Sequence, residues 1–216
     1  MLFRSIQDTK YNNKKIKNII VMVPDGCSQS VQTMARWYSG EELQLDSMGA
    51  GMVSTYMSDS LITDSASAAT AFSTGYKTSD GALSVGPNPA TLLSIIDPTT
   101  VAEPYVPLAT VLEGAKLKGK ATGLVATSEI PHATPAAFAS HVESRKLYDD
   151  IIEQMVYQEI DVVFAGGKDF LSISRQDGEN LTKVLMDRGY QFVETEDEMM
   201  SLNSGKTWGM FAGTAM

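Results

Sequence analysis

The chain has 216 residues, 43% of them hydrophobic, which is enough for one globular domain with an apolar core, and we expect a single domain over residues 1–216. Its net charge of −9 argues against a broad nucleic-acid surface, which requires a basic patch, and its single cysteine, Cys27, excludes an internal disulfide. No apolar run is long enough to span a membrane, and the first residues lack the apolar core of a secretory signal.

The first element that the sequence predicts is a buried parallel strand that runs into an Asp-Gly turn. Residues 17–24 are mostly apolar and are followed by Asp25 and Gly26. Open α/β sheets bind ligands outside the carboxyl ends of their strands. We therefore expect Asp25 to lie at a strand end where a ligand could bind.

Residues 62–75 place a serine, Ser65, at a turn that opens into a helix of very small residues. The free backbone N–H groups and the positive dipole end of such a helix can hold an anion, and small side chains allow a ligand to approach closely. Phosphate fits this description. The alternative is that Asp64 or Ser65 only caps a buried, alanine-rich helix.

The rest of the chain alternates between strand and helix patterns, which predicts an α/β fold with a parallel sheet and helices on both faces. The residues between 81 and 107 are rich in Pro, Ser and Thr and predict a long surface loop. Strand-like apolar runs occupy residues 19–23, 123–126 and 161–165, and helical patterns occupy residues 65–73, 109–118, 146–158 and 178–188.

Taken together, these segments resemble the alkaline phosphatase family in residue type, order and approximate spacing. The run that starts at residue 62 resembles the family's nucleophile signature, in which the serine after the aspartate becomes transiently phosphorylated. The likeness extends from about residue 17 to the end of the chain. The other matching segments are residues 17–26, 76–85, 126–145, 161–167 and 207–216.

The resemblance implies a role for each matching residue. Ser65 would be the metal-activated nucleophile, because a serine hydroxyl must lose its proton to a base or a metal. Asp25 would bridge a zinc and a magnesium, and Thr134 would add an oxygen ligand on the magnesium side. Arg145 would clamp two phosphate oxygens with its planar guanidinium, and Asp64 would orient Arg145.

The two histidines, His132 and His141, are expected to have different roles. His132 stands where some family members have an aspartate that holds magnesium waters and others have histidine, so we expect a metal-adjacent group or a direct metal ligand. His141 falls within a helix that leads to Arg145, and we expect it to be a packed or capping residue.

The family uses two zincs and one magnesium, and most of the ligands come from the carboxyl-terminal half. The two histidines of this chain do not match the spacing of those zinc ligands. The expected fold is therefore a three-layer alkaline-phosphatase-like domain, a mostly parallel sheet between helices, truncated at its carboxyl-terminal side. The expected function is metal-dependent hydrolysis of phosphomonoesters through a phosphoserine, with Zn2+ and Mg2+ as cofactors. The alternative is a non-catalytic fragment that binds phosphate or a partner half.

Other enzymes fit the sequence less well. Sulfatases and cofactor-independent phosphoglycerate mutases share a related metal-bearing fold, but their nucleophile surroundings differ from those of Ser65. A Ser-His-Asp hydrolase is disfavoured because no Gly-x-Ser-x-Gly elbow surrounds Ser65. By the resemblance, the partners are phosphate monoesters and inorganic phosphate, the protein is a homodimer, and its location is periplasmic or extracellular.

Overall fold

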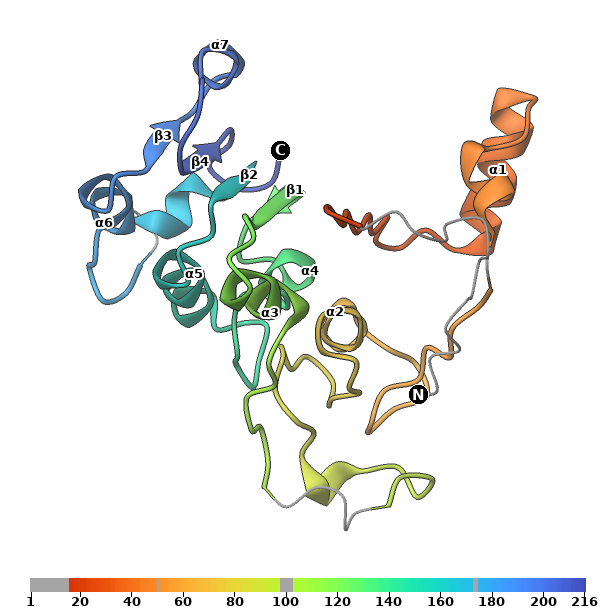
Figure 1. Ribbon diagram of the computed structural model, residues 1–216. Helices are drawn as coiled ribbons and strands as arrows, with labels where there is room; N and C mark the ends of the chain where they lie inside the picture. The colour runs from red at the N-terminus through yellow and green to blue at the C-terminus, as the bar shows by residue number, and fades with distance from the viewer. Residues whose placement is uncertain (1–15, 50, 98–102, 173–174) are drawn as a thin grey trace. The chain divides into compact units, whose positions relative to one another are not determined.

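The computed structural model describes residues 16–49, 51–97, 103–172 and 175–216 (Figure 1). The chain divides into two compact units, one ending at Ser54 and the other beginning at Thr55. The first unit carries α1, and the second carries the sheet and the other α-helices. The expectation of one domain over residues 1–216 stays a prediction.

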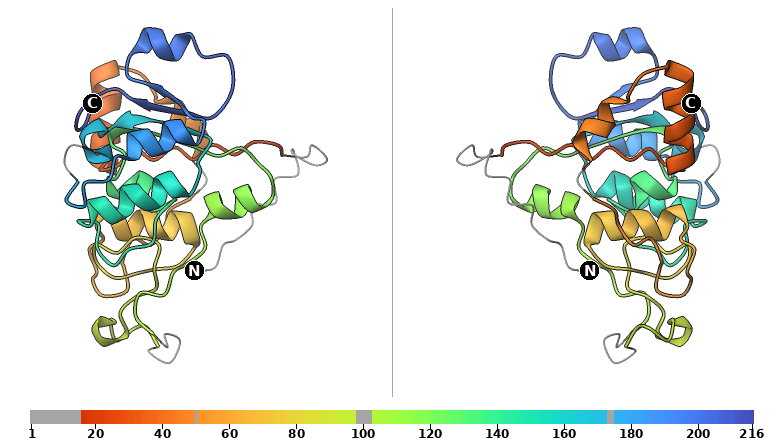
Figure 2. Two further views of the ribbon diagram at one scale, coloured as in Figure 1. Left: turned by 90° about the vertical axis from the view of Figure 1, so that its left-hand side faces the viewer. Right: turned by 90° about the vertical axis from the view of Figure 1, so that its right-hand side faces the viewer.

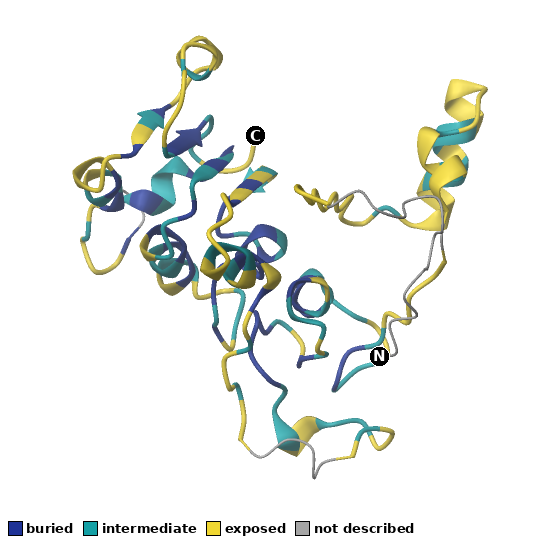
Figure 3. Cartoon of the chain, in the orientation of Figure 1, coloured by how far each residue is buried: buried dark blue, intermediate teal, exposed yellow. Residues whose placement is uncertain are grey.

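The amino-terminal unit contains helix α1, Gln29–Ser39, whose two ends are both capped. At its start, the Oγ of Ser28 accepts a hydrogen bond from the N–H of Val31 at 3.4 Å. At its end, Gly40 adopts the left-handed conformation with a φ of 72°. No residue of α1 is buried, as the yellow and teal colouring of this helix shows (Figure 3).

The residues before α1 differ from the expectation. Residues 17–24 form no strand, and their apolar side chains are largely exposed. A strand requires a neighbouring strand for its hydrogen bonds, and the described part of this unit contains none. The predicted buried strand is therefore wrong in this structure. The predicted turn at Asp25 and Gly26 is confirmed, because the N–H of Cys27 donates to the carbonyl oxygen of Pro24 at 3.0 Å.

The second unit is built on a four-stranded sheet with the order β1-β2-β4-β3, in which every neighbouring pair is parallel. This arrangement confirms the predicted α/β class and the strands expected at residues 123–126 and 161–165. The short strand β3 was not expected from the sequence. The strands are β1, Gly123–Glu129; β2, Val162–Gly166; β3, Gln191–Val193; and β4, Thr207–Met210.

The apolar core lies between this sheet and two helices, α5, Tyr148–Tyr157, and α6, Leu181–Asp187. The parallel register aligns Leu124, Val163 and Trp208 on neighbouring strands, so their side chains share one face of the sheet. All three are buried in one cluster with residues of α5 and α6. Figures 1 and 2 show these two helices alongside that sheet.

The remaining helices of the second unit are shorter or lie outside the α5 and α6 layer. Helices α2, α3, α5 and α6 confirm the predicted helical patterns, whereas α1 and α7 were not expected. In the part of the chain that the structure describes, no helix is both long and apolar enough to cross a bilayer, which takes about 20 residues. The remaining helices of the second unit are α2, Ser65–Thr74; α3, Val111–Leu117; α4, Ala133–Ala136; and α7, Glu196–Met200.

Helix α2 is attached to the segment that follows it by buried hydroxyl groups. The Oγ1 of Thr70 donates to the carbonyl oxygen of Ala82 at 3.2 Å and accepts from the N–H of Ser84 at 2.8 Å. Residues 82–85 are all buried. The surface loop predicted over residues 81–107 is therefore wrong at its beginning, because the α2 hydroxyls satisfy these backbone groups away from water.

Substitution of Gly166, the last residue of β2, tests how closely the chain packs at this end of the sheet. A Cβ at this position would collide with the backbone carbonyl oxygen of Thr214. We expect Gly166→Ala to lower the free energy of unfolding by about 1–3 kcal/mol, measured by urea denaturation. Gly114→Ala is the control, because a Cβ at this position meets no atom within 4 Å. Gly114 lies in α3, where alanine should stabilise the folded chain by up to about 1 kcal/mol. Equal effects of the two substitutions would contradict this packing.

Candidate active site

The start of α2 carries the predicted nucleophile. Asp64 is the N-cap residue, and its Oδ1 accepts a hydrogen bond from the backbone N–H of Ser67 at 2.8 Å. Ser65 is the first residue of the helix and is partly exposed. The sequence left open whether Asp64 or Ser65 caps the helix, and the structure assigns the cap to Asp64. The Ser65 hydroxyl therefore lies at the positive end of the helix dipole.

Arg145 is bound at the same helix start, although 80 positions separate it from Ser65 in the sequence. Its Nη1 donates to the Oδ2 of Asp64 at 3.1 Å, so the two carboxylate oxygens of Asp64 serve two different partners. About a quarter of each side chain is exposed, 27% for Arg145 and 23% for Asp64. The structure thus brings Asp64, Ser65 and Arg145 together, and Asp64 is placed to orient the guanidinium.

His132 lies on the other side of the guanidinium. The Nη2 of Arg145 is 3.2 Å from the Nε2 of His132. Arginine has no acceptor atom, so Arg145 can only donate in this contact. A metal ion at Nε2 would compete with Arg145 for this nitrogen. The contact gives His132 a position beside the predicted phosphate clamp.

Thr134 belongs to α4, whose N-cap residue is His132. This helix packs against α2, the helix that carries Ser65. Pro135, at the third position of α4, lacks a backbone N–H, but an N–H there would have no partner within the helix. Thr134 is partly exposed, so its hydroxyl lies on an accessible part of a helix that contacts the nucleophile helix.

The segment that carries Arg145 is held by backbone hydrogen bonds. The N–H of Arg145 donates to the carbonyl oxygen of Gly81 at 2.7 Å, and Leu83 and Val142 exchange two antiparallel hydrogen bonds of 2.9 and 3.0 Å. The predicted helix leading to Arg145 is therefore wrong: α4 ends at Ala136, because the bridge to Leu83 requires an extended backbone. The sequence analysis missed Gly81, for which the Asp-Gly turn at residues 80–81 was the available signal.

The charge state of Asp64 follows from its partners. Burial raises its pKa, but hydrogen bonds from Ser67 and Arg145 outweigh this effect, and the pKa lies below its ordinary value of 3.8. Asp64 is thus a carboxylate at neutral pH and neutralises part of the guanidinium charge. The remaining hydrogen-bond capacity of Arg145 is available for an anion.

The lowered pKa of Asp64 predicts a pH-dependent stability. The folded chain binds fewer protons than the unfolded chain near pH 4, so this stabilisation is complete above about pH 4 and is lost as the pH falls through the folded-state pKa. Asp64→Asn keeps an acceptor for the Ser67 N–H but removes the charge. We expect wild type to be the more stable at pH 7 and the difference to vanish in acid, measured by urea unfolding. A difference that does not change with pH would contradict this role of the charge.

A second polar pair lies at the carboxyl end of β1. The hydroxyl of Tyr148 donates to the Oε1 of Glu129 at 3.0 Å, and the Tyr148 ring packs edge-on against Phe170 with ring centroids 5.1 Å apart. Burial and the Glu129 carboxylate raise the pKa of Tyr148 to about 12. The sequence analysis did not identify this pair, because 19 residues separate its members and neither stands in a recognisable motif.

Asp25 belongs to the amino-terminal unit, where it lies in an exposed turn; the cluster around Arg145 consists of residues of the second unit. Among the described residues, one group of three acidic side chains has ligand atoms close enough to hold a metal: Glu153, Asp177 and Glu179. This group surrounds the guanidinium of Arg175, whose side chain has no exposed surface. Arg175 pairs with all three carboxylates, and its charge offsets one of their three negative charges, so the group is explained as an ion-pair network.

The described part of the chain is thus an α/β protein in which an arginine is bound at a helix start that carries a serine. The chain belongs to the alkaline phosphatase family, whose family model matches residues 16–216. It is 38% identical to alkaline phosphatase 3 of Bacillus subtilis over 96% of this chain and 44% of that relative. It is 33% identical to the repressible alkaline phosphatase of Saccharomyces cerevisiae over 87% of this chain and 35% of that relative. The chain thus spans less than half the length of either relative.

Solved structures give the same result for the fold. The cold-active alkaline phosphatase of a psychrophilic Shewanella superposes with a TM-score of 0.74 and 32% identity, over 89% of this chain and 45% of that protein. A mutant of the TAB5 alkaline phosphatase with Mg bound in its M3 site superposes with a TM-score of 0.70 and 27% identity, over 86% of this chain and 50% of that protein. The similarity therefore covers most of the described fold.

Proposed function

We propose that this chain supplies the nucleophile and the phosphate clamp of a metal-dependent phosphomonoester hydrolase. The observation that carries the proposal is the arrangement of Arg145, held by Asp64, at the helix start that carries Ser65. The guanidinium, the helix dipole and the backbone N–H groups all favour an anion there. Membership of the alkaline phosphatase family supports the same reaction.

In the proposed reaction, Arg145 binds the phosphoryl group and Ser65 forms the covalent bond to it. Arg145 binds two oxygens of the phosphoryl group and turns the phosphorus toward Ser65. The deprotonated Oγ of Ser65 attacks phosphorus, the ester P–O bond breaks, and the alcohol oxygen leaves with the bonding electron pair and takes up a proton. Water then attacks the phosphoserine, which releases inorganic phosphate and restores the hydroxyl. Arg145 holds the phosphoryl oxygens in both steps.

The hydroxyls of Ser65 and Thr134, both in the second unit, are hard oxygen donors of the kind that magnesium prefers. That Asp25 of the amino-terminal unit is a further ligand is proposed from the family resemblance alone. Zinc, which the family resemblance also implies, usually takes three protein ligands and so calls for donors beyond these. A bound metal would supply positive charge that lowers the pKa of the Ser65 hydroxyl. We propose that His132 lies next to this metal and binds Arg145 rather than the metal itself.

A second function, phosphate binding without turnover, is favoured by the extent of the chain. The chain covers 44% of its Bacillus subtilis relative, so the nucleophile and clamp could serve a site that other residues complete. In that case the Arg145 cluster would bind inorganic phosphate, and hydrolysis would require a partner half.

The test is hydrolysis of p-nitrophenyl phosphate at alkaline pH by the protein supplied with zinc and magnesium, with a chelator as control. If the chain is a metal-dependent phosphatase, it turns over p-nitrophenyl phosphate, and the chelator abolishes this turnover. A folded chain that binds phosphate through Arg145 without turnover would support the binding function instead. Turnover that persists in the chelator would contradict the metal dependence.

We also propose that the complete protein is a homodimer that acts outside the cytoplasm, as the family resemblance implies. Fractionation of cells and light scattering of the purified protein test the two statements separately. Recovery in the cytoplasm would contradict the location, and a monomeric mass would contradict the dimer.

A further inference from the structure

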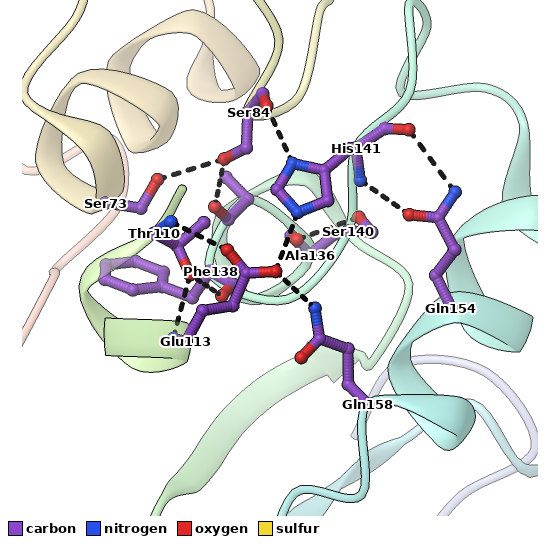
Figure 4. Close-up of polar contacts among 11 residues, drawn as sticks. Ser73, Ser84, Thr110, Glu113, Ala136, Phe138, Ser140, His141, Gln154 and Gln158 are labelled. Atoms are coloured by element: carbon purple, nitrogen blue, oxygen red, sulfur yellow. Dashed lines mark hydrogen bonds and ion pairs between the residues drawn. The ribbon is translucent and has the colours of Figure 1, made fainter. Parts of the chain in front are cut away.

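His141 lies in a buried polar network that the proposed chemistry does not use. Its Nδ1 is 2.8 Å from the carbonyl oxygen of Ser84, and its Nε2 is 2.9 Å from the Oε1 of Glu113 (Figure 4). The two side chains are largely buried, with exposed fractions of 17% for His141 and 23% for Glu113. The expectation that His141 is packed agrees with these contacts.

Glu113 is surrounded by hydrogen-bond donors. Its Oε2 accepts from the backbone N–H of Thr110 at 2.8 Å, and its Oε1 accepts from the Nε2 of Gln158 at 2.6 Å as well as from His141. Burial raises the pKa of Glu113, but these hydrogen bonds outweigh it, and the pKa lies below its ordinary value. Glu113 is therefore a carboxylate, and it accepts from three partners.

His141 bridges two acceptor groups. One ring nitrogen lies within hydrogen-bond distance of a backbone carbonyl oxygen, and the other lies within hydrogen-bond distance of a carboxylate oxygen. Helix α3, which carries Glu113, and the buried segment at Ser84 are thereby joined through one side chain.

The backbone of His141 is held from a third direction. Its N–H donates to the Oε1 of Gln154 on α5 at 2.7 Å, and the Nε2 of Gln154 donates back to the His141 carbonyl oxygen at 3.3 Å. The next residue, Val142, forms the bridge to Leu83, and Arg145 follows three residues later with its N–H bound to Gly81. The His141 contacts thus fix the start of the short segment that ends at the phosphate clamp.

We propose that His141 is a positioning residue for Arg145: its ring contacts with the Glu113 carboxylate and the Ser84 carbonyl oxygen hold the segment 141–145 so that the guanidinium lies at the start of α2. The inference rests on the proposed phosphate-binding role of Arg145. Loss of the ring would leave the Glu113 carboxylate with an unfilled acceptor position in a partly buried site, and the segment would shift to fill it. A shift of about 1 Å at a binding group is enough to weaken its function strongly.

The experiment is titration of inorganic phosphate into the full chain, followed by the 15N resonances of the Arg145 side chain. We expect His141→Ala to displace these resonances and to weaken phosphate binding about tenfold. His141→Gln keeps a donor for Glu113 and should restore affinity to within about threefold of wild type. Lys183→Ala, which breaks an exposed ion pair with Asp187, is the control that should change neither reading.

The outcomes separate this inference from the proposed function. If Arg145→Ala and wild type bind phosphate alike, the clamp itself is wrong. If Arg145→Ala loses binding while folded His141→Ala keeps the wild-type affinity and resonances, the clamp stands and the positioning role is overturned. Should His141→Ala fail to fold, Glu113→Gln tests the role instead, since the amide has one acceptor oxygen in place of the two that contact Thr110, Gln158 and His141. Wild-type affinity and Arg145 resonances in folded Glu113→Gln would overturn the role.

Discussion

Replacing Ser65 by alanine is expected to lower the turnover of p-nitrophenyl phosphate by on the order of 10³-fold or more. The substitution removes the only atom of the chain that the proposed mechanism allows to form a bond to phosphorus. It leaves the Asp64 cap and the Arg145 contact in place, because neither uses the Ser65 side chain. Phosphate should therefore still bind to the variant, and the loss should appear in kcat.

Ser67→Ala is the matched control for this prediction. Ser67 lies two residues further along α2, and its hydroxyl donates to the carbonyl oxygen of Ser79 at 2.8 Å and also helps to lower the pKa of Asp64. The alanine variant keeps the backbone N–H that Asp64 accepts. We expect a loss of stability of about 1 kcal/mol and turnover within a few-fold of wild type. Equal loss of turnover in both variants would mean that Ser65 has no special role.

Replacing Arg145 by alanine is expected to lower kcat/KM by about 10²-fold, because a charged donor to the phosphoryl oxygens is lost. Arg145→Lys should recover only part of this loss. Lysine keeps the charge but lacks the planar fork that binds two oxygens, and its donors all lie on one nitrogen, whereas Arg145 contacts Asp64 and His132 through two different nitrogens.

Arg188→Lys provides the control for charge and size. The Arg188 guanidinium lies over the Tyr157 ring at 4.5 Å and binds Glu159 on the surface, so this exchange should leave kcat/KM unchanged. Steady-state kinetics at saturating and limiting substrate separate the effects on kcat and KM. Full activity of Arg145→Lys would contradict a clamp that depends on the guanidinium fork.

The sequence was most informative where the pattern is local. Continuous apolar runs predicted β1 and β2, and the row of small residues after Ser65 predicted α2, since both signals depend on neighbours in the chain. The predicted strand before Asp25 failed because a strand depends on pairing with another segment, which its own residues do not encode. The helix expected before Arg145 failed for a similar reason: the bridge between Leu83 and Val142 overrides local helix propensity.

In the candidate site, too, contacts between distant segments were harder to predict than local structure. The pairing of Asp64 with Arg145 was expected, but only through the resemblance to a family, because 81 positions separate the two residues. The contact between Arg145 and His132 and the contact between His141 and Glu113 were not foreseen. Each depends on how separate helices pack, and single histidines carry no spacing pattern that identifies their partners.

The most direct test of the central claim is to locate the covalent phosphoryl group. The chain, supplied with zinc and magnesium, is incubated with a phosphomonoester, quenched in acid and digested, and the modified residue is identified by mass spectrometry. The account predicts one added phosphoryl group on Ser65, absent from Ser65→Ala and retained in Ser67→Ala. A phosphoryl group on another residue, or release of phosphate with none on Ser65, would contradict it.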